Sequence, residues 1–342
     1  MRSDEISNIE DHAWLRAYLC DIGRLEAGDP LEVRTLSGGV SSRAVWVRMP
    51  TGAEWVLKQS LAKLRVKADW YADPARIGRE ACGLRECARL APPGSTPELV
   101  FHDEARWLVA MTAVPQPHDN WKQLLLRGEV VVDHFIQFAE LLAALQVRSQ
   151  RASDELEPVF RDRSYFESLR VEPYYRYTRS RVVESEAFFD ELIADTLARR
   201  ECYVHGDFSP KNVLVYAGRL VLVDYEVSHW GDAAFDVGFA LTHLLANARH
   251  VAGRSEILTA AALQFWRTYS ASAQSHFSDL EQRVIRHTLG CLLARVDGRS
   301  PLEYLDDGAR TRQRESTLAL MRRQPASVPA LIHAFVSGGN NS

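Results

Sequence analysis

Residues 205–226, HGDFSPKNVLVYAGRLVLVDYE, carry the pattern that decides the fold of this 342-residue chain. Two apolar runs rich in β-branched residues flank Gly218, which is the pattern of a tight β-hairpin. Pairing of the two runs brings Asn212 and Asp224 opposite each other at the open end of the hairpin. The sequence therefore predicts a small polar site at this end.

Four polar side chains are expected to converge there. Asp207 lies in the loop just before the hairpin, and Glu226 follows Asp224 by two residues, on the same side of an extended segment. Together with Asn212 they form a set of hard oxygen donors that suits Mg²⁺ better than zinc. Carboxylates this close repel one another unless a cation neutralises them. The alternative, solvated polar ends of a hairpin, explains any one of these residues better than all four.

The N-terminal third of the chain has the alternation and the turn sequences of a sheet. A leading amphipathic helix is expected at residues 9–23, and Asp73-Pro74 opens a second helix at about 75–90. Five short runs have strand character and are separated by Gly- and Pro-containing turns: 31–36, 43–48, 54–59, 99–102 and 107–112. This block predicts a five-stranded antiparallel sheet with a helix.

Helical periodicity dominates after residue 115. The apolar spacing predicts helices at 131–148, 188–199, 233–248, 257–269, 280–294 and 311–322. The hairpin of residues 213–223 interrupts them once. We therefore predict an α+β chain of two lobes, residues 1–114 and residues 115–342.

Composition excludes several classes of protein. The chain is 46% hydrophobic and 25% charged, with a formal net charge of −4, so bulk positive charge for binding nucleic acid is lacking. No apolar run approaches the roughly 18 residues of a membrane span. The five cysteines form no CxxC pair, and the acidic N-terminus does not resemble a signal peptide. The expected location is the cytoplasm.

The pattern His205-x-Asp207-x₄-Asn212, followed by Asp224-x-Glu226, resembles the catalytic and metal motifs of the aminoglycoside phosphotransferase family. That family shares the protein-kinase-like fold with choline kinases and methylthioribose kinases, and the resemblance covers about residues 31–245. It implies a phosphoryl transfer that depends on ATP and Mg²⁺, with Asp207 as the catalytic base and with Asn212 and Asp224 as metal ligands. The Asp-x-Glu spacing is closer to methylthioribose kinases, which implies that Glu226 also binds metal.

The same resemblance implies a nucleotide site in the N-terminal lobe. Lys58, in the third predicted strand, would contact the α- and β-phosphates, and Glu80 in the following helix would hold it, with Glu86 as a competitor for that role. The glycine-rich turn between the first two strands would cover the phosphates through Ser37, Gly38, Gly39, Ser41 and Ser42.

The fifth predicted strand ends where the composition changes, so we expect the hinge between the lobes there. The family likeness implies that backbone groups of Thr112 and Val114 bind adenine and that Met111 lines its site. The alternative is an ordinary exit from a strand.

Three further features are ambiguous in the sequence. The family likeness implies that Asp236, and likewise His205, braces the catalytic loop, with an acid–base role for His205 as the alternative. Asp232 is expected to cap the helix that follows it. Residues 295–299 either line the acceptor site or only end a helix. The acid-rich residues 184–195 either attract a cationic amino sugar or form a solvated helix face.

The favoured function is phosphorylation of a small hydroxyl-bearing acceptor, such as an aminoglycoside, a methylthioribose-like sugar or an amino alcohol. A nucleotide-binding pseudokinase is the alternative, although Lys58, Asp207, Asn212 and Asp224 are all present. A protein kinase is disfavoured because Ser209 replaces the lysine expected two residues after the catalytic aspartate, and no Ala-Pro-Glu segment follows. The sequence does not identify the acceptor or the oligomeric state.

Overall fold

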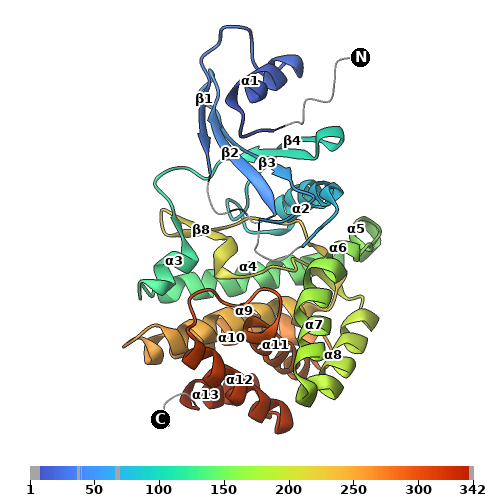
Figure 1. The fold of residues 1–342 in the computed structure, drawn as a ribbon, viewed down its shortest axis with the longest axis vertical. Coiled ribbons are helices and arrows are strands. Elements are labelled where there is room, and N and C mark those ends of the chain that lie inside the picture. Colours follow the sequence, from blue (N-terminus) through green and yellow to red (C-terminus); the bar gives the residue numbers. More distant parts are fainter. Residues whose placement is uncertain (1–7, 37–38, 40, 66–69, 339–342) are drawn as a thin grey trace.

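A computed structural model describes residues 8–36, 39, 41–65 and 70–338. The N-terminal sheet lies at one end of the long axis and the helical lobe at the other, with strand β8 (Val213–Tyr216) between them (Figure 1). Within the described residues, no helix is long and apolar enough to cross a membrane. The separation into a lobe with a sheet and a helical lobe confirms the two-lobed α+β prediction.

The N-terminal sheet has the five antiparallel strands that the sequence predicts. Its spatial order is β1-β2-β3-β5-β4, with β1 (Glu32–Thr35), β2 (Ser42–Arg48), β3 (Glu54–Ser60), β4 (Leu99–Asp103) and β5 (Leu108–Thr112). Strand β5 begins one residue later than predicted, because Trp107 adopts a left-handed conformation (φ 51°) that ends the 3₁₀ turn η2 (Glu104–Arg106). Helix α1 (His12–Asp21) covers one face of the sheet and buries Leu15 and Leu19 in its core.

Helix α2 (Ile77–Leu90) packs on the other side and carries the predicted glutamate. It follows a single 3₁₀ turn, η1 (Pro74–Arg76), whose N-cap is Asp73 as the Asp-Pro pair indicated. Its hydrophobic face joins the core of the C-terminal lobe together with Val109 and Met111 of β5, so α2 packs between the sheet and that lobe. This placement buries Glu80 completely.

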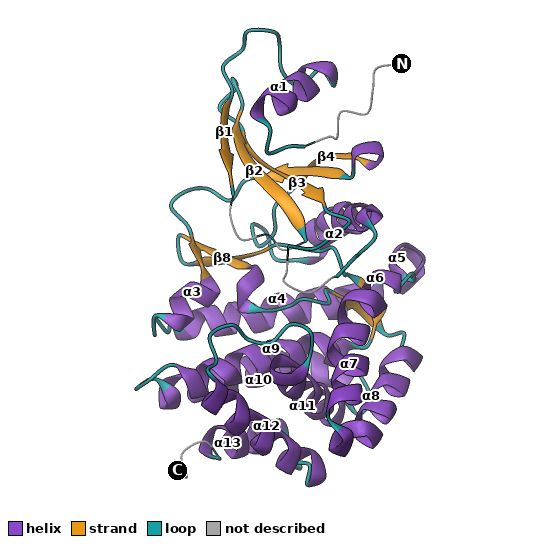
Figure 2. Ribbon diagram, in the orientation of Figure 1, coloured by secondary structure: helices purple, strands orange, loops and turns teal. Residues whose placement is uncertain are grey.

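Helices build most of the C-terminal lobe, as Figure 2 shows. They are α3 (Trp121–Leu126), α4 (Val132–Arg151), α5 (Ser153–Phe160), α6 (Ser164–Phe166), α7 (Tyr177–Arg181), α8 (Glu186–Ala198), α9 (Ala233–His250), α10 (Ser255–Ala273), α11 (Leu280–Asp297), α12 (Asp307–Arg322) and α13 (Val328–Ser337), with short turns η4 (Val183–Ser185) and η6 (Gln274–His276). Helix α9 is central, because its residues 233–248 are all buried.

The sequence analysis did not predict α3, α5 or α13, and it also missed a longer helical stretch before α8. Residues 164–181 are helical throughout, and the middle part, η3 (Glu167–Arg176), has π-helical hydrogen bonding with Pro173 inside it. Proline is ordinarily a helix breaker because it lacks an N–H group. The sequence analysis did not predict this helix, which supplies part of the candidate site.

The predicted hairpin is present with the predicted turn. Strand β8 pairs with β9 (Arg219–Leu222), and the turn residues Ala217 and Gly218 both have positive φ. Three strands too short to show a period were not predicted: β6 (Asp119–Asn120), which pairs with β8, and β7 (Cys202–Val204), which pairs with β10 (His229–Gly231). The predicted boundary between the two lobes, between residues 114 and 115, lies in the segment that connects β5 to β6, and this boundary stays a prediction.

Candidate active site

The loop after β7 presents Asp207, which is almost completely buried. Arg170 of η3 lies 2.9 Å from its Oδ2 and also donates from Nε to the carbonyl oxygen of Gly206 at 2.7 Å. Only glycine fits at 206, since its φ is +80° and a Cβ would lie 2.7 Å from the carbonyl oxygen of Val227. Arg170 therefore fixes both the carboxylate and the loop that carries it.

Asp207 is ionised at neutral pH in this environment. Burial raises its pKa, but the charges of Arg170 and Lys211 outweigh burial, and the net pKa lies below the ordinary value. The group is thus suited to hold and orient a hydroxyl and to take its proton late in a reaction.

Asp236 binds the same loop from the first turn of α9. Its two carboxylate oxygens accept hydrogen bonds from the backbone N–H groups of His205, at 2.7 Å, and Gly206, at 2.9 Å. These contacts are the expected brace of the catalytic loop. Burial raises the pKa of Asp236 to about 7 in spite of the two bonds.

His205 is a brace of the same kind. It is fully buried, and its Nδ1 accepts a hydrogen bond from the backbone N–H of Asp207 at 3.2 Å. Burial lowers the pKa of His205 to about 4, so the ring is neutral at physiological pH. A neutral, fully enclosed ring favours the bracing role over the acid–base alternative.

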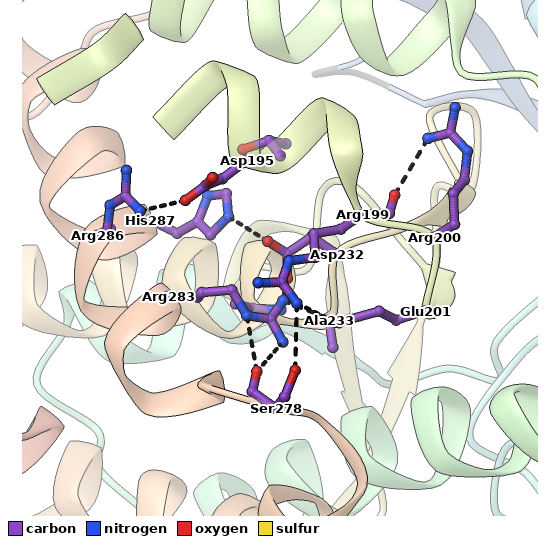
Figure 3. Close-up of polar contacts among 12 residues, drawn as sticks. Asp195, Arg199, Arg200, Glu201, Asp232, Ala233, Ser278, Arg283, Arg286 and His287 are labelled. Atoms are coloured by element: carbon purple, nitrogen blue, oxygen red, sulfur yellow. Dashed lines mark hydrogen bonds and ion pairs between the residues drawn. The ribbon is translucent and has the colours of Figure 1, made fainter. Parts of the chain in front are cut away.

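A second buried network anchors α9 behind Asp236. Asp232 caps the helix by accepting from the N–H of Ala234 at 2.9 Å, which was expected from the sequence. Figure 3 shows its carboxylate between Arg283 and His287 of α11, both of which bond to it. The network ties α9 to α11 and so holds the position from which Asp236 reaches the loop.

The mouth of the hairpin collects the predicted polar groups. Asn212 donates from Nδ2 to the backbone carbonyl oxygen of Asp207 at 3.0 Å. The backbone carbonyl oxygen of Asn212 accepts a hydrogen bond from the N–H of Val223 at 3.0 Å. Asp224 follows at once, in a left-handed conformation (φ 76°) that is costly for a residue with a Cβ. Such strain persists only where contacts over-determine it, and the site supplies them.

Lys58 and Glu80 provide these contacts from the other lobe. Lys58 Nζ lies 2.9 Å from Glu80 Oε1 and 2.6 Å from Asp224 Oδ1, while Glu80 Oε2 accepts from the N–H of Tyr225 at 2.6 Å. Burial would lower the pKa of Lys58, but the two carboxylates raise it well above its usual value. The competitor Glu86 pairs with Arg89 instead.

The charge of Asp224 follows from the same contact. Burial raises its pKa, and the nearby charges of Lys58 and Lys211 lower it further than burial raises it. Asp224 and Asn212 together offer the carboxylate and amide oxygens that suit Mg²⁺, which typically takes one or two protein carboxylates and completes its shell with phosphates and water. The donor set therefore fits the metal that the sequence predicted.

Glu226 forms an ion pair with an arginine of the N-terminal lobe. Its Oε2 lies 2.9 Å from Nε of Arg76, a completely buried side chain that also donates to the carbonyl oxygens of Ser41 and Leu61. Among the residues that the structure describes, no three acidic, histidine or cysteine side chains group as a metal site. Metal binding by Glu226 stays a prediction. Arg76 was missed, since nothing in its local sequence marks it.

The predicted nucleotide-binding segments lie beside this site. Ser37 and Gly38 are outside the described residues. A Cβ at Gly39 would lie 2.6 Å from the carbonyl oxygen of Ser42, so the tight turn requires glycine there, and Ser42 begins β2. Arg76 holds the carbonyl oxygen of Ser41, which places this turn in the same network as Glu226.

Some backbone groups of the predicted hinge already have hydrogen-bond partners within the protein. Met111 is buried in β5, and the N–H of Thr112 already donates to the carbonyl oxygen of Glu98 at 2.9 Å. The carbonyl oxygen of Val114 lies 3.1 Å from Nδ1 of His118. The adenine contacts of Thr112 and Val114 stay a prediction, and Thr112 has only its carbonyl group to offer.

Known proteins share this architecture. Methylthioribose kinase 2 of Oryza sativa subsp. japonica is 23% identical over 266 residues, which are 69% of this chain and 62% of that protein, so the chain spans less than two thirds of its length. A choline kinase from Cryptosporidium parvum Iowa II superposes with a TM-score of 0.56 at 12% identity, over 94% of this chain and all of that one. An ADP-bound aminoglycoside phosphotransferase gives 0.52 at 15% identity, over 89% and 98%. These structural likenesses confirm the kinase-like fold.

The family assignment rests on the sequence match itself. The model of the phosphotransferase enzyme family matches residues 32–274, which is most of the chain and includes the sheet, the catalytic loop and the hairpin. The predicted resemblance is confirmed, and the chain belongs to the phosphotransferase enzyme family.

Proposed function

We propose that this protein transfers the γ-phosphoryl group of ATP, with Mg²⁺, to a hydroxyl group of a small molecule. The observation that carries the proposal is the meeting of Lys58 and Glu80 from the N-terminal lobe with Asp224 from the hairpin, at 2.9 and 2.6 Å from one ammonium group. Asp207 and Asn212 are hydrogen-bonded to each other beside it.

The roles of the side chains follow from their chemistry. When bound, ATP would supply the electrophilic phosphoryl group, and Mg²⁺ would neutralise part of the charge of the phosphates. Asn212, Asp224 and Glu226 are the candidate ligands of the metal. Lys58 is held by Glu80 to contact phosphate oxygens. Asp207 orients the acceptor hydroxyl, whose oxygen forms the new P–O bond as the bond to ADP breaks, and accepts its proton. Arg170 keeps Asp207 in place.

A pseudokinase without turnover is the second candidate, and the presence of Lys58, Asp207, Asn212 and Asp224 argues against it. The test is ADP release from Mg·ATP with aminoglycosides, methylthioribose, other sugars, choline and homoserine as acceptors. Asp207→Ala serves as the blank. Release that depends on an acceptor and vanishes in the variant supports the proposal. Release that persists in Asp207→Ala, or failure of Mg·ATP to raise the melting temperature, refutes it.

A further inference from the structure

Arg295, near the end of α11, carries a charge that the protein does not balance. Its side chain is only 7% exposed. Its hydrogen bonds go to the carbonyl oxygen and the Oγ of Ser300, at 2.8 and 3.0 Å, and to Nε2 of His243, at 3.0 Å. All three acceptors are neutral, and its buried Nε has no partner. Within the described residues Arg295 forms no ion pair, although a buried cation without a counter-charge is costly.

The carboxylates around it are already engaged. Asp297 pairs with Arg314, Glu303 with Lys122, and Asp207 with Arg170. Lys211, whose charge acts on the same region, has no carboxylate partner among the described residues either. The region therefore holds more positive than negative charge.

His243 shows that the fold itself responds to this surplus. Arginine can only donate, so Nε2 of His243 must accept the bond from Arg295, and the ring is neutral. Burial lowers the pKa of His243 far below its usual value, and the charges of Arg295, Lys122, Lys211 and Arg170 lower it further. A protonated ring here would add one more unbalanced charge.

The surplus lies next to the candidate catalytic base. The guanidinium groups of Arg170 and Arg295 stand over the same two rings, at 5.7 and 5.0 Å from Tyr174 and at 5.8 and 5.3 Å from Phe239. Arg170 is the residue that holds Asp207. A molecule that presents a hydroxyl group to Asp207 therefore lies beside Arg295.

We propose that the acceptor is a hydroxy acid, whose carboxylate pairs with Arg295 while its hydroxyl group reaches Asp207. This inference rests on the proposed function and narrows its acceptor. A carboxylate has the charge and the planar geometry that a guanidinium group binds through short, charge-assisted hydrogen bonds. Among residues 295–299, Arg295 alone thus takes the acceptor-lining role that the sequence left open for this segment.

The acidic surface that could have attracted a cationic amino sugar argues in the same direction. Asp190 pairs with Arg179 at 2.6 Å, and Asp195 pairs with Arg286. These carboxylates of α8 are matched by arginines on neighbouring helices and are partly exposed, which is the solvated helix face that was the alternative. Neither of them pairs with Arg295.

The experiment compares acceptors of two related series in which one functional group is neutral, anionic or cationic. ADP release from Mg·ATP is measured with D-glucose, D-glucuronate and D-glucosamine, and with glycerol, D-glycerate, glycerol 3-phosphate and serinol. We expect turnover to be highest with the carboxylates, and KM for the carboxylate acceptor to rise about 10- to 100-fold in Arg295→Gln, the value of one charge-assisted contact. KM for ATP should stay unchanged. If turnover is higher with glycerol 3-phosphate than with D-glycerate, the acceptor group at Arg295 is a phosphate ester and the hydroxy-acid assignment is overturned.

Two variants separate the contact from general damage. Arg295→Lys keeps the charge and should recover part of the loss, and Arg299→Gln, an exposed arginine four residues later, should behave as the wild type. If no acceptor turns over, D-glycerate is titrated calorimetrically into the Mg·ATP-bound protein: binding that Arg295→Gln abolishes supports the site. Best turnover with a neutral or cationic acceptor, or carboxylate binding that is equal in Arg295→Gln, overturns it. Failure of Mg·ATP to bind refutes instead the underlying kinase assignment.

Discussion

The ion pair between Arg76 and Glu226 allows a quantitative test of how the two lobes are joined. Arg76 is completely inaccessible and the Glu226 side chain is 9% exposed, with 2.9 Å between Nε and Oε2. Glu226→Gln removes the negative partner and leaves a buried guanidinium without a counter-charge. Removal of one partner from a buried pair typically costs about 3–5 kcal/mol, because the remaining charge stays desolvated.

The matching double variant tests the cause of this cost. Arg76→Met combined with Glu226→Gln removes both charges, so the penalty of an unpaired ion disappears. Arg76→Met alone also loses bonds to the carbonyl oxygens of Ser41, Leu61 and Asp73, and this loss persists in the double variant. We expect the two single changes to sum to about 2–3 kcal/mol more than the double change.

Urea unfolding of the four proteins at pH 7 measures these free energies. Arg127→Gln, at an exposed pair with Glu129, is the control and should leave the midpoint unchanged. A cost below about 1 kcal/mol for Glu226→Gln, or strictly additive single changes, would refute the view that a buried charge pair joins α2 to the hairpin segment. A Mg²⁺ titration of activity in Glu226→Gln decides separately whether this residue binds the metal: a higher Mg²⁺ requirement is expected of a ligand.

Three further expectations concern catalysis and pH. Asp207→Asn should lower kcat by at least about 100-fold and leave Mg·ATP-dependent thermal protection intact, since a base is lost and no nucleotide contact is; parallel loss of protection would contradict this. Asp224→Asn should weaken nucleotide binding only when Mg²⁺ is present, and an equal loss in EDTA would count against its ligand role. The buried rings of His205 and His229 have pKa values lowered by burial to about 4 and about 3, so the unfolded chain binds more protons below pH 6.5. The contribution of each ring to stability should therefore fall as pH drops from 6.5 towards 4, by about 2 kcal/mol per ring at pH 5. Asp236 and Glu80, whose pKa values are raised to about 7, act in the opposite direction, so the effect is measured as the difference in urea midpoint between the wild type and His229→Gln. An equal pH dependence of the two proteins would refute it.

Local patterns in the sequence were sufficient for the sheet, the hairpin and several site residues. The alternation of short apolar runs predicted all five strands of the N-terminal sheet, and Gly218 located the hairpin turn. The pairing of Lys58 with Glu80 and the binding of the catalytic loop by Asp236 were expected and are present. The strands and the turn depend on periodicity and on turn residues within short segments, which are visible in a single sequence. The two contacts were implied by the family resemblance.

The buried arginines that organise the site were beyond this kind of inference. Arg76 meets Glu226 across 150 positions, and Arg170 meets Asp207 across 37, from a helix that the sequence analysis did not predict. The chain has 36 arginines, and no local pattern separates these two, or Arg295, from those on the surface. Whether a charged side chain needs a partner depends on how much water it loses, and that loss is set only when helices distant in sequence pack together.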